Sequence, residues 1–398
     1  MSPPDPASEL TVVDHHDPRR LAELREEWRA LFDAAAAPAP FLSWEWLHTW
    51  WRHFGGRRRL WVLEARDRTG ALAGALALSS RPGLLGARRW QLVGNGVTGA
   101  DGLDVLARAD AAGAARTAIA RSLARVPAPW DVIDLEDLPC GSPTVAALRS
   151  ALLPRRVRVL NERGFVCPAF ALRGTYAQHL ERTRRRETFG RRVRWLARQP
   201  GFRIEVATSP GEVVPAMEDF LRLHRLRWAA EGGSYGIPPG AVEDFHREVG
   251  PLLAGRGWLR LYRLLVGGEA IAAVYGIEVG RRFYYYQSGW DPRWSARSPG
   301  AVLVGRTVED AYARGLADYD FLRGTEPYKL DWAADRRETC TLRLRAPSLR
   351  ADTAAAAEEA FRTARGLARA VAPERVWGAL RRARRSLDVG AMAGARAP

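Results

Sequence analysis

Apolar residues recur along the chain at two spacings, which separate predicted helices from predicted strands. Apolar positions three and four apart predict helices at residues 17–32, with Asp17 before the first turn, and at residues 41–54. The second helix carries tryptophans on two of its sides, so we expect it to be buried or to line a cleft. Strand-type runs at residues 60–65, 73–79 and 89–93, separated by turns, predict an antiparallel meander.

The second half of the chain predicts the same order of elements. A strand at residues 203–207 precedes helices at 210–230 and 240–254, strands at 258–266, 270–279 and 282–288, a helix at 299–314 and a short strand at 319–322. We therefore predict an α/β (α+β) protein with mixed, largely antiparallel sheets flanked by helices. The expected parts are an N-terminal domain at 1–172, a connecting helix at 173–200, a C-terminal domain at 201–347 and an Ala/Arg-rich helical tail at 348–398.

Composition narrows the class of protein. The chain has 398 residues, of which 47% are hydrophobic and 27% charged, and this is typical of a globular protein with more than one core. Cys140, Cys167 and Cys340 lie far apart in the sequence and predict neither a disulfide framework nor a metal site. Because we find no secretory signal and no apolar run of about 18 residues, we expect a cytoplasmic protein without a transmembrane span.

Positive charge points to anionic partners without choosing among them. The chain has 61 basic and 45 acidic residues, and residues 181–198 contain eight arginines against two glutamates. This stretch is a candidate contact for an anion such as tRNA, with Arg185 and Arg192 singled out, although a solvated basic face remains the alternative. The basic segment at 371–387 is interpreted as a surface helix, with peripheral membrane contact as the alternative.

Two local features invite a chemical interpretation. Every basic residue is arginine except Lys329, and a compact ammonium group is not interchangeable with a guanidinium group. Lys329 is therefore a candidate functional residue. Gly94, Gly96 and Gly99 match a phosphate-binding glycine pattern, but no helix opens directly after Gly99, and we favour a plain glycine turn.

Two segments carry a resemblance to a known family. They are YYYQSGWDPRWSARSPG (residues 284–300), together with the helix that follows, and YDFLRGTEPYKLDWA (residues 319–333). They resemble the acyltransferase domain of the GNAT superfamily, in the branch of a cellulose-biosynthesis protein, with peptidoglycan-bridge aminoacyltransferases as relatives. A fainter similarity is FLSWEWLHTWW near the start, with the arginine-rich helix. The resemblance implies tandem GNAT-like acyl-CoA N-acyltransferase domains, of which the second holds the donor.

The resemblance also implies where acetyl-CoA or another acyl-CoA would bind as cosubstrate. Ser298, Pro299 and Gly300 suit the start of a helix whose free N–H groups face the pyrophosphate. The family's pattern at this place is matched by Arg297 and Gly300, whereas Val302 departs from it. The predicted cofactor-binding residues are Arg293, Arg297, Ser298, Gly300 and Ala301.

Acyl transfer to an amine needs a proton acceptor, an oxyanion stabiliser and an acid for the leaving group. Tyr285 faces away from Tyr284 and Tyr286 on a strand and is a candidate acid, with aromatic packing as the alternative. Lys329 is expected to bind a carboxylate, a phosphate or the oxyanion, and Glu326 or Asp320 to accept a proton; a surface ion pair is the alternative. Further candidate substrate-binding residues are Asp101, Asp104, Tyr286 and Tyr328.

Three functions follow from these features. The first is a GNAT acyltransferase that moves an acyl group from acyl-CoA to an amine or hydroxyl of an envelope or polysaccharide-related acceptor. The second is an aminoacyltransferase that uses aminoacyl-tRNA. The third is a non-catalytic GNAT-like binding module.

Overall fold

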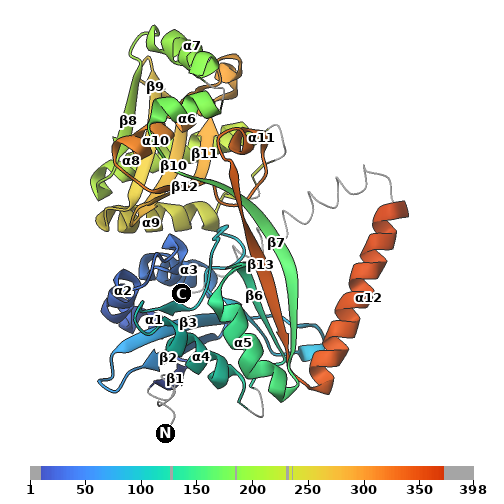
Figure 1. The fold of residues 1–398 in the computed structure, drawn as a ribbon. Coiled ribbons are helices and arrows are strands. Elements are labelled where there is room, and N and C mark those ends of the chain that lie inside the picture. The colour runs from blue at the N-terminus through green and yellow to red at the C-terminus, as the bar shows by residue number, and fades with distance from the viewer. Residues whose placement is uncertain (1–9, 126–128, 184–185, 230–232, 235, 372–398) are drawn as a thin grey trace. The chain divides into compact units, whose positions relative to one another are not determined.

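The chain folds into two compact units, seen in a computed structural model that describes residues 10–125, 129–183, 186–229, 233–234 and 236–371 (Figure 1). Unit 1 comprises residues 1–96, 102–164 and 340–398, and unit 2 comprises residues 97–101 and 165–339. Unit 2 therefore takes five residues from the glycine-rich loop of the first half. Of the predicted tail, residues 349–371 form a helix of unit 1, whereas residues 372–398, with most of the basic segment 371–387, lie outside the described residues; the end of the last strand also belongs to unit 1.

Unit 1 contains a mixed sheet in which β1, β2, β3, β4 and β6 are neighbours in that order. The pairs are antiparallel except β4 with β6, which is parallel. The strands are β1 (Thr11–His15), β2 (Leu60–Arg66), β3 (Leu72–Arg81), β4 (Arg89–Leu92), β5 (Leu106–Ala107) and β6 (Val132–Pro139). The helices are α1 (Arg20–Glu23), α2 (Arg25–Asp33), α3 (Trp44–Phe54), α4 (Ala112–Leu123), α5 (Pro143–Leu152) and α12 (Leu349–Val371).

Unit 2 has a sheet in the order β12, β11, β10, β9, β8, again with a single parallel pair, β11 with β12. Its strands are β8 (Arg203–Ala207), β9 (Leu259–Val266), β10 (Glu269–Val279), β11 (Arg282–Trp290) and β12 (Asp318–Asp320). Its helices are α6 (Tyr176–Arg182), α7 (Arg186–Ala197), α8 (Pro210–Ala229), α9 (Ala241–Gly255), α10 (Pro299–Ala313) and α11 (Pro327–Leu330). The long strands β7 (Arg158–Ala171) and β13 (Asp335–Arg345) each contribute residues to both units.

The two units repeat one order of elements, which confirms the predicted fold class. In each, a first strand and helices precede three antiparallel strands, and a helix then leads into a strand that pairs in parallel with the third of them. That helix is α4 in unit 1 and α10 in unit 2.

Helices cover both faces of the sheet in unit 2. Successive residues of β10 point to opposite sides of the sheet, so neighbouring residues contact different helices. Val274 belongs to the core cluster that also contains Val304 and Val308 of α10. Tyr275 packs on the other face, where its ring lies 5.5 Å from that of Phe220 in α8.

The structure corrects the predicted connecting helix. Residues 175–198 form two helices, α6 and α7, rather than one. Thr175 starts α6 with a capping box in which Gln178 is the reciprocal partner. In α7, Phe189, Val193 and Leu196 pack against the core of unit 2, as the apolar stripe predicts.

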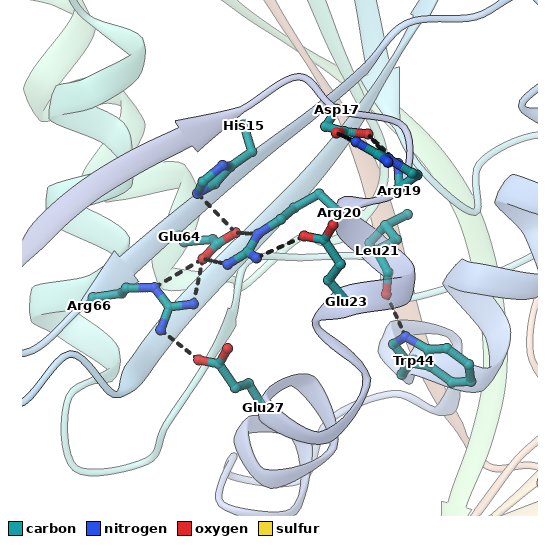
Figure 2. A network of polar contacts seen from close by, with 10 residues as sticks. All are labelled: His15, Asp17, Arg19, Arg20, Leu21, Glu23, Glu27, Trp44, Glu64 and Arg66. Atoms are coloured by element: carbon teal, nitrogen blue, oxygen red, sulfur yellow. Dashed lines mark hydrogen bonds and ion pairs between the residues drawn. The ribbon is translucent and has the colours of Figure 1, made fainter.

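Unit 1 buries a charged network around Glu64, a residue of β2 whose side chain has no solvent exposure (Figure 2). Arg20 donates to Glu64 Oε1 and Oε2 at 2.7 and 2.9 Å, and Arg66 donates to Oε2 at 3.0 and 2.6 Å. Burial raises the pKa of Glu64, but the hydrogen bonds from Arg20 and Arg66 outweigh it, so this pKa lies below its usual value. The network fixes α1 on β2.

The tryptophan-rich helix α3 is buried, as expected from its tryptophans on two sides. Trp44, Trp46 and Trp50 are buried, and Ser43 caps the helix by accepting a hydrogen bond from the N–H of Trp46. Within the described residues, none of the helices has the length and apolarity needed to cross a membrane.

Candidate active site

The parallel ladder between β11 and β12 is short, and it ends where the candidate residues begin. Only residues 282–284 of β11 pair with residues 318–320 of β12. Directly after the ladder, β11 contains a bulge at Tyr286, where the register with β10 shifts from Tyr285–Gly276 to Gln287–Tyr275. Tyr285 contacts Phe321 and Tyr328, whereas Tyr286 contacts Tyr275, so the predicted alternation of these two tyrosines is confirmed.

Asp320 ends β12 and fixes the loop that follows. Its Oδ1 accepts a hydrogen bond from the N–H of Leu322 (2.8 Å), and its Oδ2 accepts one from Arg337 (2.7 Å). Leu322 has a positive φ of 55°, an unusual conformation for a branched residue, and the Asp320 side chain holds it there. Burial raises the pKa of Asp320, although Arg337 opposes the shift. Asp320 thus has one oxygen bound to the loop and the other to Arg337 of β13.

Lys329 is buried in α11, and its ammonium group has two partners. Nζ donates to the carbonyl of Arg323 (2.5 Å) and lies 3.1 Å from Glu326 Oε2. The Glu326 carboxylate in turn lies over Gly324, which has a φ of +112° and where a Cβ would come within 2.4 Å of Oε2. The loop from Gly324 to Lys329 therefore brings together an ammonium group and a carboxylate, as the sequence suggested.

The segment 97–101 contacts this loop through Arg323. Asp101 accepts hydrogen bonds from the N–H and Nε of Arg323 at 2.7 and 2.6 Å, and the carbonyl of Ala100 accepts one from Nη2 at 2.8 Å. The Tyr286 hydroxyl donates to the carbonyl of Thr98. The glycine-rich loop thus supports the residues around Lys329, and its glycines Gly94, Gly96 and Gly99 all have positive φ, as in a turn.

Two phenols lie beside each other in this part of unit 2. The Tyr328 hydroxyl donates to the Tyr285 hydroxyl over 3.4 Å. Burial raises the pKa of Tyr285, and burial together with the neighbouring Tyr285 raises the pKa of Tyr328. Both side chains therefore carry their proton at neutral pH and can act as donors.

Cys167 of β7 is the buried thiol of this region. Burial first, and then the charges of Asp101 and Asp320, raise the pKa of the Cys167 thiol. The thiol is protonated at neutral pH, which argues against a role as a nucleophile.

The predicted donor-binding residues lie at the start of α10. Pro299 is the first helical residue, as expected, but Ser298 has a φ of 51° and makes no capping bond with its side chain, so the predicted Ser298 cap is wrong. Gly300 faces the indole of Trp290, where a Cβ would stand 3.1 Å from Cδ1, and Ala301 is half-buried in the first turn. The glycine therefore permits close packing of the indole on the helix.

The arginines before α10 already have protein contacts. Arg293 donates to Asp291 (2.8 Å) and to Glu269 (3.2 Å). The guanidinium of Arg297 lies 4.0 Å from the ring centroid of Trp195 in α7. A ligand phosphate would have to compete with these two carboxylates for Arg293. Arg297, in contrast, is exposed where it lies on the indole of Trp195.

The other candidates belong to unit 1, to α7 or to residues outside the described ranges. Asp104 belongs to unit 1, where it accepts hydrogen bonds of 2.5 Å from the hydroxyls of Ser142 and Thr144 at the start of α5. Arg192 is half-buried in α7, and Arg185 lies outside the described residues.

Sequence reasoning missed three contacts of the cluster: Arg323, Arg337 and the carbonyl of Thr98. Arg323 is one arginine among many, and its partner Asp101 is 222 positions away. The one available signal was the position of Arg323 between the short strand and Glu326.

Comparisons with known proteins concern the domain that holds these residues and the fold. Residues 183–330 match the family model described as "Acetyltransferase (GNAT) domain". The structure is similar to the crystal structure of FemX, with a TM-score of 0.57 and 11% identity over 83% of this chain and 96% of the other. It is also similar to a conserved protein of unknown function from Bacteroides thetaiotaomicron, with a TM-score of 0.50 and 13% identity over 82% of this chain and 97% of the other. Among curated proteins, none matches the chain.

The matched segment holds Tyr285, Glu326 and Lys329, so the cluster lies inside the acetyltransferase domain. The expectation of a GNAT acyltransferase domain is confirmed, and the structural similarities support the fold. In the described residues, no three His, Cys, Asp or Glu side chains form a group able to hold a metal ion.

Proposed function

We propose that the chain transfers an acyl group from acyl-CoA to an amine or hydroxyl of an envelope or polysaccharide-related acceptor, and that the reaction takes place in unit 2. The observation that carries this proposal is the Lys329–Glu326 pair, which follows the end of the short β11–β12 ladder inside the acetyltransferase domain. The class of acceptor rests on the sequence resemblance of residues 284–300 and 319–333.

Lys329 and Glu326 have complementary parts in such a transfer. An ammonium group has three donors; the Arg323 carbonyl takes one and Glu326 lies within reach of a second, so one N–H of Lys329 is left to stabilise an oxyanion or a phosphate. Glu326 is partly exposed, with 42% of its side chain accessible, so it can accept the proton that the attacking amine loses. Asp320 then serves as a positioning residue that holds the loop.

Tyr285 and Tyr328 supply the acid. When the amine attacks the thioester carbonyl and the C–S bond breaks, the thiolate needs a proton. A phenol that is protonated at neutral pH can give it, and the 3.4 Å contact lets one hydroxyl support the other. Tyr328 is the member of the pair on α11, directly before Lys329.

The fold offers two places that fit an acyl-CoA. Beyond Tyr284, the ladder between β11 and β12 does not continue among the described residues, and we assign the amides of a pantetheine arm to this edge. The first turn of α10 presents the N–H groups of Gly300 and Ala301, which suits a pyrophosphate. Acyl-CoA would supply the activated thioester.

Binding and turnover test this proposal in the full chain. Calorimetry with acetyl-CoA and with a longer acyl-CoA should show saturable binding, and chromatography should detect CoA release when amine acceptors are added. Lys329→Ala should bind donor and fold normally but release CoA at least about 100-fold more slowly, as for loss of an oxyanion donor. Unchanged turnover would remove the lysine from the mechanism, and absence of binding by both donors would contradict the acyl-CoA assignment.

Aminoacyl-tRNA remains a second candidate donor because Arg191 and Arg194 of α7, and Arg198 directly after it, are exposed. Phosphate contacts of this kind make binding strongly salt-dependent. Binding of tRNA that weakens steeply between 50 and 200 mM salt, on the order of 10³-fold or more, would favour this donor. Salt-independent or absent binding would disfavour it.

A further inference from the structure

A groove of about 570 Å³ opens in unit 2 beside α6 and the turn after α11. Its walls come from the end of β7, from α6 and from residues 330–335, and within the described part of the chain Lys329, Glu326 and Tyr285 do not line it. Its volume falls within the range of small-molecule sites, about 300–1,000 Å³. The groove is therefore large enough for a ligand and separate from the residues assigned to acyl transfer.

Aromatic rings form one side of the groove. The His179 ring lies between Phe170 (centroids 4.5 Å apart) and Trp332 (5.9 Å, planes within 8°). Each of the three residues is at most 4% exposed, so a ligand in the groove would meet the edge of this stack rather than its ring faces.

His179 is the unusual member of this stack. The residue is 4% exposed, and in the described residues its Nε2 has no hydrogen-bond partner. A buried polar atom without a partner destabilises the folded chain, and neither Phe170 nor Trp332 can supply a partner from its ring face. Burial, with a smaller contribution from Arg182, lowers the pKa of His179 to about 4, so the ring is neutral at pH 7.

Charge at the groove comes from two arginines and two aspartates. Arg173 and Arg182 line it, and Nη2 of Arg182 donates to the carbonyl of Arg173 over 3.1 Å. Asp331 and Asp335 line it at the turn after α11. The guanidinium groups favour one anionic group, and the aspartates disfavour a ligand with negative charge spread over its whole length.

We propose that this groove binds a small molecule with a single carboxylate or phosphate group, held by Arg173 and Arg182, and an apolar part that contacts the edge of the Phe170–His179–Trp332 stack, where His179 Nε2 has no partner in the described residues. Guanidinium groups match both anions through paired N–H donors. Because Trp332 lies three positions after Lys329, an occupant would contact the turn that follows the ammonium group. This site goes beyond the proposed acyl transfer and does not depend on it.

Nuclear magnetic resonance of the histidine rings tests the proposal in the full chain, which has seven histidines. The probes are benzoate, phenyl phosphate and the neutral benzyl alcohol, and His179→Gln assigns the His179 signal. Benzoate or phenyl phosphate should shift that signal saturably. Arg182→Gln should weaken the binding about tenfold or more, as expected when a charged hydrogen bond is lost.

Control variants separate recognition of the anion in the groove from general effects of removing an arginine. Arg281→Gln removes an exposed arginine from the turn between β10 and β11, outside the groove lining, and should leave affinity unchanged. Arg182→Lys keeps the charge and serves if the glutamine variant does not fold. If only benzoate or only phenyl phosphate binds, the groove prefers a carboxylate or a phosphate group, respectively. Equal binding of benzyl alcohol, or no saturable shift with any probe, overturns the proposal.

Discussion

Asp101 and Arg323 form the contact on which the position of Lys329 depends. The Asp101 carboxylate accepts hydrogen bonds from the N–H and Nε of Arg323 at 2.7 and 2.6 Å, and the carbonyl of the same arginine accepts one from Lys329 Nζ at 2.5 Å. A change at position 101 is therefore transmitted to the ammonium group through a single residue.

Asp101→Asn should lower the turnover of the acyl transfer about tenfold with a smaller change in KM, because it loosens Arg323 without removing a substrate contact. Steady-state kinetics measures both constants. Asp110→Asn changes an exposed aspartate of unit 1 that is paired with Arg108, and it serves as the control with unchanged kinetics. An equal loss of turnover in both variants would contradict the transmission from Asp101 through Arg323 to Lys329.

Lys329 can be followed chemically, because it is the only lysine of the chain. An amine-directed reagent should modify position 329 slowly, since only 7% of this side chain is exposed, and saturating acetyl-CoA should slow the reaction further. Asp101→Asn should accelerate it. Peptide mass spectrometry measures the rate, with the α-amino group as internal reference; a rate that acetyl-CoA leaves unchanged would place the donor elsewhere.

Gly324→Ala should damage the site, because this residue has a φ of +112° and a Cβ would meet Glu326 Oε2 at 2.4 Å. Backbone strain of this kind costs about 1–3 kcal/mol, and the displaced carboxylate should lower turnover. Gly113→Ala is the matched control, since a Cβ there meets nothing within 4 Å and the residue lies in α4. Thermal unfolding and turnover compare the two variants.

The Glu64 network predicts the acid limit of stability. The folded-state pKa of Glu64 lies below its value of 4.5, so its contribution is present above pH 4.5 and is lost as the pH falls through the folded pKa. Glu64→Gln should destabilise the protein by about 3 kcal/mol at pH 7, because it leaves Arg20 and Arg66 without their buried partner. Denaturant titrations at pH 7 and below pH 4 should show this difference shrinking in acid.

The buried His224 predicts a second pH range in which stability is lost, at a higher pH than for Glu64. It contacts the carbonyl of Ser288 through Nδ1 (3.1 Å) and Ser234 through Nε2 (2.8 Å), and burial lowers its pKa from 6.5 to about 4. Because the unfolded chain binds this proton more readily, stability should fall as the pH drops from 6.5 towards 4, by at most about 3 kcal/mol. His224→Gln should flatten this part of the curve; an unchanged slope would assign it to other groups.

Local signals predicted most helices and strands, whereas long-range contacts did not emerge from the sequence. Pro299 marked the start of α10 because proline suits a first helical position. The strand β7 was missed because most of its residues from Arg158 to Phe165 are exposed and leave no apolar alternation. The break between α6 and α7 was also missed, since apolar spacing and arginines continue across it.

The candidate site was predicted in the same uneven way. Lys329 and Glu326 stand three positions apart, so local spacing sufficed to bring them together. The proton-accepting role suggested for Asp320 did not anticipate that Leu322 and Arg337 occupy its oxygens. Pairing of Asp101 with Arg323 depends on tertiary folding over 222 positions and leaves no local pattern.

The discontinuous composition of both units bears on how the protein is made. Unit 2 needs residues 97–101 as well as 165–339, and unit 1 receives its last strand residues only from position 340 onward. During synthesis on the ribosome, unit 2 can thus finish folding before unit 1 has received all of its chain. A stop codon placed shortly after residue 339 would leave the N-terminal part unfinished, even though the segment with Lys329 had been translated in full.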